Sequence, residues 1–481
     1  MCHYVMLFLS VLPHMAAPPI EVPLNQRQLF LDDHVIESME NVARTLHQPV
    51  KHPDNPVLRR EHPWEGFRVQ VYGTVLYDPE LDMFKAWYMN IPATAAQKIV
   101  VNGERRPGHA TLLSYATSKD GVHWHKPVLN LVDFEGSTRN NMIAPDLYNP
   151  EGFSVLYEPH DPNPERKYKA FYWDHGRGPT IMHEGQEIYG VGKEDGMHVA
   201  FSPDGVHWTP YKDNPVMDVG SDSGQVVLFD PRIEKYVAFS RLGFGRRVAR
   251  AESRDFVRWT RPELVLQADA HDPPNTEIYG ISVDLYEGMY IGVLWMFYIE
   301  EGRVGPIDFQ LAWSRDGKAW TRDPERRVFL GRGDENAWDF GDMRGACRSV
   351  ILEDKIYLYY AGSNAIHGRG AEENKGMDIG LAILRRDGWM SIDGGDVPGV
   401  LITKPFLHPG GTLHINADAA NGHITVQYLA EEVPGPISVS GNHTSVPVAF
   451  PRQTPSDLAG KLVRLRFTIQ KASLYSFWFA E

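Results

Sequence analysis

The chain has 481 residues, a formal net charge of −14 at pH 7 and a pI of about 5.8. This acidic balance argues against a nucleic-acid partner, because phosphates require a basic surface. The length exceeds that of one ordinary domain, and no apolar stretch suits a membrane span.

The first 17 residues contain an apolar run, Tyr4 to Leu12, followed by Ala16 and Ala17. The pattern resembles a secretory signal, although the basic residues usual at its start are missing. We therefore expect residues 1–19 to be a signal segment and the protein to be secreted or periplasmic. The two cysteines, Cys2 and Cys347, cannot form a disulfide framework and do not indicate a redox compartment.

A short phrase, Ser-x-Asp-Gly-x-x-Trp, recurs along the chain. Its copies are Ser118 to Trp124, Ser202 to Trp208, Ser253 to Trp259 (with Phe in place of Gly), Ser314 to Trp320 and a shorter Arg385 to Trp389. Asp-Gly favours a two-residue hairpin turn, since Gly adopts positive φ and Asp tolerates it. We expect each Trp to begin the returning strand and to pack against the neighbouring repeat.

A second polar turn lies upstream of each copy and leads into an aromatic, β-branched strand. These strands are Phe84 to Tyr88, Tyr168 to Trp173, Tyr236 to Phe239, Tyr290 to Trp295 and Ile356 to Tyr360. Each repeat therefore has four strands in an up-down meander, and five repeats predict a five-bladed β-propeller. The expected blades span about 67–132, 153–216, 225–266, 278–330 and 348–389.

The segments that flank the blades also carry strand patterns. Residues 28–36 and 43–47 are expected to form short strands, one of which completes the fifth blade, because few residues follow Gly388 there. After Gly399 the pattern changes to alternating strands that predict a small β-sandwich. The predicted fold is all-β, with a propeller at 20–395 followed by a C-terminal β-sandwich at 396–481.

The meander decides which loops share a face of the propeller. The turns between strands 1 and 2 and between strands 3 and 4 lie on one face, and the 2–3 loops lie on the other. The second set contains long insertions, Asn90 to Thr111, Asp174 to Gly196 and Gly362 to Met377. Long loops on a rigid scaffold usually carry function, so we expect the site on that face, over the central channel.

Three carboxylates enter this face from three adjacent blades: Asp222, Glu277 and Asp342. Acids gathered in a confined pocket acquire separated pKa values, which gives one proton donor and one ionised base or nucleophile. Glycosidic bond cleavage requires that division, so these three are the expected catalytic residues. The expected substrate-binding residues are Arg68, Tyr72, Asp174, His175, Tyr279, Arg344 and His367.

No HxH or HxxxH metal-ligand spacing links the loop histidines His109, His175, His183 and His367. The sequence also contains no Gly-rich phosphate loop, nucleophile elbow or dinucleotide fingerprint in a suitable context. We therefore expect no metal site and no cofactor. A structural Ca²⁺ in the central channel stays open as an alternative, although the sequence offers no ligand set for it. The sequence does not indicate an oligomeric state.

The five repeats, their turns and the C-terminal β-rich segment resemble the five-bladed glycoside hydrolases of families 32, 43, 68, 117 and 130. Bacterial proteins labelled family 32-like share phrases similar to Leu29 to Ile36, Asp222 to Pro231, Tyr286 to Trp295 and Val463 to Phe479. The resemblance covers nearly the whole chain past residue 25 and implies a glycosidase acting on a poly- or oligosaccharide. The acids of families 32 and 43 are not carried over, because Trp-Met-Asn-Asp-Pro, a blade-two Arg-Asp-Pro and a blade-three Glu-Cys are absent.

Three alternatives stay open: a non-catalytic carbohydrate-binding propeller, a sialidase-like enzyme and a phosphorylase. The sialidase Asp-box has one more residue between Asp and Gly than the turns of this chain, and no arginine triad of that family is evident. A phosphorylase needs a basic phosphate pocket, for which Arg68, Arg241 and Arg344 are candidates.

Overall fold

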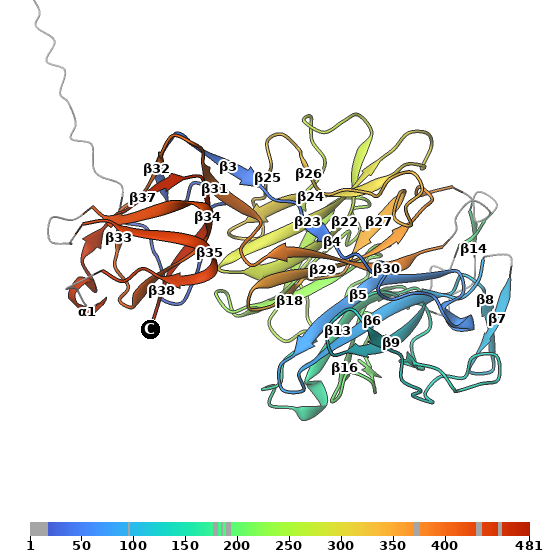
Figure 1. The fold of residues 1–481 in the computed structure, drawn as a ribbon. Coiled ribbons are helices and arrows are strands. Elements are labelled where there is room, and N and C mark those ends of the chain that lie inside the picture. The colour runs from blue at the N-terminus through green and yellow to red at the C-terminus, as the bar shows by residue number, and fades with distance from the viewer. Residues whose placement is uncertain are drawn as a thin grey trace, which may run out of the picture. The chain divides into compact units, whose positions relative to one another are not determined.

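The computed structural model describes residues 18–94, 97–176, 181–183, 186–188, 194–369, 376–429, 435–450 and 455–481. The chain divides into two compact units, Leu46–Trp389 and Met1–Thr45 together with Met390–Glu481 (Figure 1). Both units are β-rich, and the helices of the described residues are short: η1 (Pro63–Glu65), η2 (Pro164–Arg166) and α1 (Pro455–Leu458). Nearly all of the expected signal segment, including Cys2, lies outside the described residues.

The unit Leu46–Trp389 is a five-bladed β-propeller, which confirms the predicted fold class. In sheet order, blade one is β5 (Arg68–Asp78), β6 (Met83–Ile91), β9 (Leu112–Ser118) and β10 (Trp124–His125), and blade two is β12 (Pro150–Tyr157), β13 (Tyr168–Asp174), β16 (Gly196–Ser202) and β17 (Thr209–Pro210). Blade three is β18 (Val226–Asp230), β19 (Lys235–Ser240), β20 (Val248–Ser253) and β21 (Glu263–Leu266), and blade four is β22 (Thr276–Tyr286), β23 (Met289–Tyr298), β24 (Ile307–Ser314) and β25 (Thr321–Arg322). Blade five is β27 (Asp342–Gly345), β29 (Lys355–Ser363), β30 (Asp378–Arg385) and β4 (Val50–Lys51). The first strands contact one another in ring order.

Short strands supplement the blades. β11 (Met142–Ile143) pairs with β9, β26 (Val328–Leu330) with β24, and β28 (Val350–Ile351) with β29. Two hairpins, β7 (Lys98–Val101) with β8 (Glu104–Pro107) and β14 (Ile181–His183) with β15 (Gln186–Ile188), occupy the long 2–3 loops of blades one and two. The long-loop face is therefore built as the meander predicts.

The ring is closed by residues that precede the first blade. Lys51 and Val50 of β4 pair with Ala382 and Ile383 of β30. The Lys51 ammonium also lies 2.6 Å from a carboxylate oxygen of Asp339. A segment ahead of the ring thus completes blade five as expected, but the strand is β4 rather than either expected segment, 28–36 or 43–47.

The repeated turns lock neighbouring blades together. In blade two, Asp204 accepts backbone N–H groups from Val206 and His207, both at 2.8 Å, which fixes the turn. The indole of Trp87, in blade one, then donates to the carbonyl oxygen of Gly205 at 2.6 Å. Equivalent contacts join the other blades: Tyr359 donates to the Gly121 carbonyl at 2.7 Å, and the rings of Trp259 with Phe171 and Trp320 with Phe239 lie 4.8 and 5.7 Å apart. The predicted packing of turn tryptophans on neighbouring repeats is therefore confirmed.

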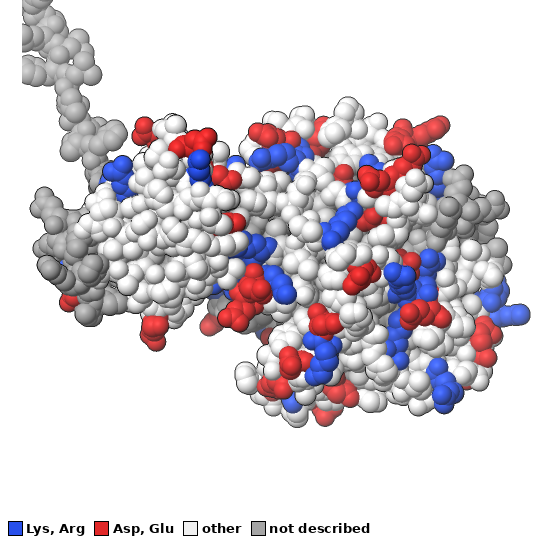
Figure 2. All heavy atoms as spheres, viewed as in Figure 1, with Lys and Arg blue, Asp and Glu red and all other residues white. Residues whose placement is uncertain are grey.

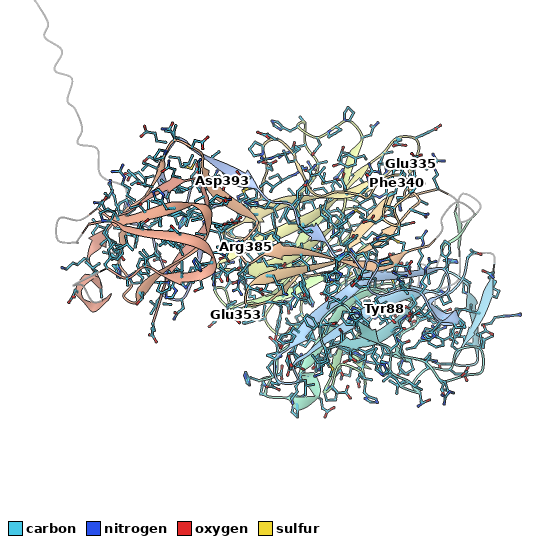
Figure 3. All side chains as sticks on the ribbon, viewed as in Figure 1. Tyr88, Glu335, Phe340, Glu353, Arg385 and Asp393 are labelled. Carbon is cyan, nitrogen blue, oxygen red and sulfur yellow. The ribbon has the colours of Figure 1, made fainter. Side chains whose placement is uncertain are left out.

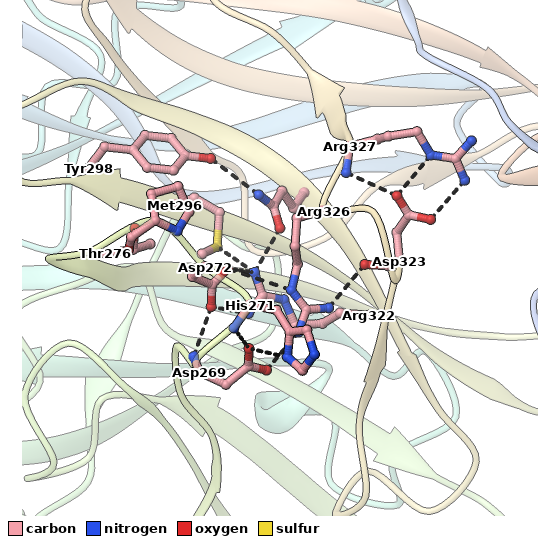
Figure 4. Close-up of polar contacts among 12 residues, drawn as sticks. Asp269, His271, Asp272, Thr276, Met296, Tyr298, Arg322, Asp323, Arg326 and Arg327 are labelled. Carbon is pink, nitrogen blue, oxygen red and sulfur yellow. Dashed lines mark hydrogen bonds and ion pairs between the residues drawn. The ribbon is translucent and has the colours of Figure 1, made fainter.

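Charged side chains of the propeller are commonly paired. Figure 2 shows acidic and basic side chains side by side over the face in view. Inside blade four, buried Arg322 contacts both carboxylate oxygens of Asp272, at 2.7 and 2.5 Å, and the Gln310 amide oxygen at 2.7 Å (Figure 4). This network ties the connection between blades three and four to the outer strand β25, which holds that connection in place.

The second unit contains a nine-stranded sheet. The main path is β2 (Ile36–Glu40), β32 (Gly399–Thr403), β37 (Leu465–Gln470), β34 (Thr412–Tyr428), β38 (Ala472–Ala480), β31 (Met390–Gly394) and β3 (Val42–Leu46), with β1 (Gln28–Leu29) on β38 and β35 (Ile437–Pro447) on β34; β33 (Phe406–Leu407) pairs separately with β36 (Leu462–Val463). This division differs from the expected boundaries, 20–395 and 396–481, because residues 28–46 pair in this sheet. The long β34 joins β37 and β38 into one branched sheet, and the expected β-sandwich stays a prediction.

We predict that Gly205→Ala destabilises the propeller more than Gly103→Ala. Both glycines have positive φ, +80° and +75°, so each alanine costs about 1–2 kcal/mol of backbone strain. A Cβ on Gly205 also meets Trp87 at 2.7 Å, whereas nothing lies within 4 Å at Gly103, so Gly205→Ala should lose about 1–3 kcal/mol more. Urea unfolding of both variants measures the difference, and equal losses would contradict the proposed contact between blades.

Candidate active site

Strand register brings one end of every blade to the long-loop face. Arg68 pairs with Ile91, Thr276 with Tyr298, and Asp342 with Ser363, so first strands begin where second strands end. The charged residues at this point of the five first strands are Arg68, Glu151, Asp222 (shortly before β18), Glu277 and Asp342. The three predicted carboxylates therefore enter from the same end of the ring.

Both carboxylate oxygens of Asp342 are bound in an ion pair with Arg344. Its two oxygens accept Nε and Nη2 of Arg344 at 3.0 and 2.6 Å, and both side chains are buried. Burial opposes ionisation most strongly, yet Arg344 and His367 together hold the pKa of Asp342 well below its usual value. His367 is half-buried and accepts Arg344 Nη2 at Nδ1, 3.1 Å away, and burial lowers its pKa. Asp342 thus orients Arg344 and is not placed to carry a proton.

Three arginines surround the ring of Tyr279 in β22. The guanidinium carbons of Arg241, Arg344 and Arg246 lie 4.5, 5.2 and 5.4 Å from its centroid. Arg241 also donates from Nε and Nη2 to the Tyr279 carbonyl oxygen, both at 3.1 Å. Blades three, four and five therefore meet at this one ring, and the guanidinium groups make the surroundings strongly positive.

Glu277 lies at the edge of this cluster. Its Oε2 is 2.9 Å from Nη1 of Arg246, and its side chain is 41% exposed. Arg246, in the loop between β19 and β20, was not identified from the sequence. That loop has no periodic pattern, and only its position between second and third strands could have marked it.

Glu151 and Asp222 form a pair of carboxyl groups with contrasting surroundings. Oε2 of Glu151, in β12, is buried and has no hydrogen-bond partner among the described residues. Burial, followed by the negative charge of Asp222, raises the pKa of Glu151 to about 8. Asp222 is instead 64% exposed, with Oδ2 3.1 Å from Nη1 of Arg241. Near neutral pH Glu151 therefore holds a proton, whereas the side chain of Asp222 is accessible to solvent.

Glu151 was missed because blade two was expected to begin at about residue 153. The structure begins β12 at Pro150, and its register with β13 shifts between Glu151 and Ser154. Gly152 has φ +66° within this irregularity, which breaks the alternation of side chains. The available signal was positional, since the other four blades place a charged residue at the same point.

Two predicted residues from blade two lie at the start of its long loop. Asp174 is buried, and its oxygens accept three backbone N–H groups at 2.9 to 3.2 Å. Its role in the structure is to anchor that backbone. The His175 ring packs against Trp173 with the ring planes tilted by 44° and the centroids 3.8 Å apart. Burial lowers the pKa of His175 to about 4, so it is neutral at physiological pH.

The two remaining predicted binding residues come from β5. Tyr72 is 2% exposed, its ring stacks on Trp295 with centroids 5.4 Å apart, and the Arg344 guanidinium lies 5.4 Å from its centroid. The Tyr72 hydroxyl is buried without a partner among the described residues. Burial, followed by the charge of Arg344, lowers the pKa of Arg68 to about 10. Arg68 and Tyr72 thus belong to the same cluster as Tyr279 and Arg344.

A cavity of about 700 Å³ lies at the same end of blades four and five. Polar groups of Arg332, Glu335 and Asn364 line it together with the ring of Phe340, and Glu335 and Phe340 are marked in Figure 3. Ile366 also lines it and is the chain neighbour of His367. The cavity is therefore adjacent to the Tyr279 cluster, and its size and mixed lining suit a sugar residue.

Two further observations concern the described residues alone. No group of three or more His, Cys, Asp or Glu side chains among them could hold a metal ion. No helix among them has the length and apolar character needed to cross a membrane.

No family model matches the chain, and no curated protein matches its sequence. Similar solved structures include a glycosyl hydrolase from Bacteroides ovatus (TM-score 0.46, 14% identity, covering 71% of this chain and 94% of that one) and a β-1,2-mannobiose phosphorylase from Listeria innocua (0.46, 11%, 70% and 96%). An α-L-arabinofuranosidase from Podospora anserina is also similar (0.40, 14%, 72% and 97%). Likeness at this level carries no argument about activity, and the resemblance to families 32 and 43 stays a prediction.

We predict losses of stability of different size for two aspartates of the cluster. Asp342→Asn leaves the Arg344 charge buried and unpaired, so it should lower the free energy of unfolding by about 3–5 kcal/mol. Asp222→Asn removes a pair in which only Asp222 is exposed, and buried Arg241 keeps its two hydrogen bonds to the Tyr279 carbonyl, so the loss should be smaller, about 1–2 kcal/mol. Urea unfolding followed by tryptophan fluorescence compares them. An Asp342→Asn variant as stable as the wild type would show that this carboxylate is not what holds Arg344.

Proposed function

We propose that the protein is a carbohydrate-active enzyme that hydrolyses a glycosidic bond at the long-loop end of the propeller. The observation that carries the proposal is the pair formed by protonated Glu151 and exposed Asp222. A glycosidase needs one carboxylic acid to protonate the leaving oxygen and one carboxylate to act at the anomeric carbon. The sequence resemblance to five-bladed glycoside hydrolases supports the same reaction class.

In this mechanism Glu151 donates its proton to the glycosidic oxygen. Asp222 acts as general base towards water or as the nucleophile. Of the predicted catalytic residues, Asp222 keeps its role, Asp342 instead positions Arg344, and Glu277 holds Arg246. The cavity beside His367 accommodates the remainder of the saccharide.

A phosphorylase is the second candidate, because four arginines, Arg68, Arg241, Arg246 and Arg344, belong to the Tyr279 cluster. In that reaction inorganic phosphate replaces water and the product is a sugar phosphate. Measuring product with and without phosphate separates the two reactions. Hydrolysis at full rate without phosphate supports the first proposal.

We predict that Glu151→Gln and Asp222→Asn each lower kcat/KM by about 10²–10⁴-fold, because each removes a group that acts in the transition state. Reducing-sugar release from a glycan panel identifies the substrate, and initial rates on it give the effect. Glu353→Gln, an exposed residue of a short turn marked in Figure 3, is the matched control and should keep the wild-type rate. Full activity of Glu151→Gln would refute its role as the acid.

We predict that kcat/KM falls above about pH 8, tenfold per pH unit. The pKa of Glu151 is raised to about 8, so the acid is protonated below that pH and loses its proton above it. A pH–rate profile on the identified substrate tests this. A rate that stays constant to pH 10 would exclude a proton donor with this pKa.

A further inference from the structure

Arg68 differs from the other arginines of the site in lacking a carboxylate partner. Its guanidinium makes no hydrogen bond or ion pair within the part of the chain that the structure describes, and its Nε is buried. Even the deeply buried Arg322 of blade four is paired (Figure 4). The other arginines of the Tyr279 cluster contact acids: Arg241 with Asp222, Arg246 with Glu277 and Arg344 with Asp342.

Counted over the described residues of the Tyr279 cluster, the charges consequently do not balance. Three of four guanidinium groups are neutralised by three carboxylates, and Glu151 holds its proton near neutral pH. One positive charge remains in excess, on Arg68. Arg68 is partly exposed with its Nε buried, so water solvates its unpaired charge only in part, and a bound anion would complete its partners.

A second group near Arg68 is also unsatisfied. The Tyr72 hydroxyl is buried without a partner among the described residues, although the ring is held between Trp295 and Arg344. A lone buried hydroxyl is uncommon in a folded protein and often marks a place where a ligand or water binds. It can donate to an anion.

Arg344 supplies a third donor at the same place. A guanidinium has five N–H groups, of which four contact Asp342, Gln70 and His367. Gln70 and Arg68 project from the same side of β5, since side chains two residues apart share a face of a strand. The remaining N–H of Arg344, the Arg68 guanidinium and the Tyr72 hydroxyl are therefore neighbouring donors.

We propose that these donors form an oxyanion subsite and that the substrate is an acidic sugar, whose carboxylate or sulfate group binds Arg68, Tyr72 and Arg344. The planar guanidinium matches the two oxygens of a carboxylate and binds them through paired hydrogen bonds. The inference deepens the proposed function, on which it rests for the reaction, but it concerns binding and is tested without turnover.

The test is calorimetric titration of the full chain with hexuronates and sulfated hexoses, each compared with its neutral parent sugar. At least one acidic sugar should bind the wild type more tightly than its parent. Arg68→Gln should weaken that binding about 10–100-fold, the effect of losing a charge-assisted hydrogen bond, and leave the neutral parent unchanged. Arg258→Gln, an exposed arginine in a turn on the opposite face, is the matched control and should bind like the wild type.

Tyr72→Phe tests the subsite without removing a charge. Because the hydroxyl has no partner among the described residues, the variant should be at least as stable to urea as the wild type. Its affinity for the acidic sugar should nevertheless fall about 3–10-fold, the effect of losing one neutral hydrogen bond. Unchanged affinity in both Tyr72→Phe and Arg68→Gln would overturn the proposal.

Inorganic phosphate is titrated in parallel to separate the two sources of an oxyanion. Phosphate binding that Arg68→Gln abolishes, with no preference for acidic sugars, would overturn the inference in favour of a phosphorylase. Glu151-dependent hydrolysis of a neutral glycan with no acidic preference would keep the proposed function and reject the inference. Arg68-dependent binding of an acidic sugar that is never cleaved would keep the inference and reject the proposed function.

Discussion

The propeller depends on one repeated contact, in which an aromatic side chain of one blade binds the polar turn of the next. The Trp87 indole reaches the Gly205 carbonyl, and the Tyr359 hydroxyl reaches the Gly121 carbonyl. Each contact gives a buried donor its hydrogen-bond partner and also buries a large aromatic ring. The same contact therefore fixes both the position of the ring and its packing against the neighbouring blade. Because the turn residues set where each ring can go, the inclination of every blade follows from chemistry at its short-turn end.

That rigid end leaves the opposite end free to carry long loops and charge. Arginines and carboxyl groups from all five first strands gather there, and most neutralise one another. The exceptions are informative: Glu151 is protonated beside exposed Asp222, and Arg68 has no acid partner among the described residues. In a cluster whose other arginines are each paired with an acid, these exceptions mark where another molecule could bind.

The sequence predicted the blades well because their signals are local. Turn residues and aromatic strands lie within a few positions of each other, and the strand register places the long loops together at one end of the ring. Glu151 was missed because a bulge at Gly152 interrupts strand alternation. The closing strand β4 was missed because it has only two residues beside a proline, and its partner β30 lies more than 300 residues away along the chain. Pairing over such distances leaves no periodic pattern in the sequence.

The position of β4 has a consequence for synthesis on the ribosome. Blades one to four are complete in sequence order, but the fifth needs residues 50–51 and residues 378–385 together. The nascent propeller therefore remains an open arc, with unpaired edges at both ends, until most of the polypeptide has emerged. The sheet of the second unit is also incomplete until late in synthesis, because β2 pairs with β32, which is synthesised much later. A chain cut short during translation would leave both units unfinished, so only full-length products should escape quality control.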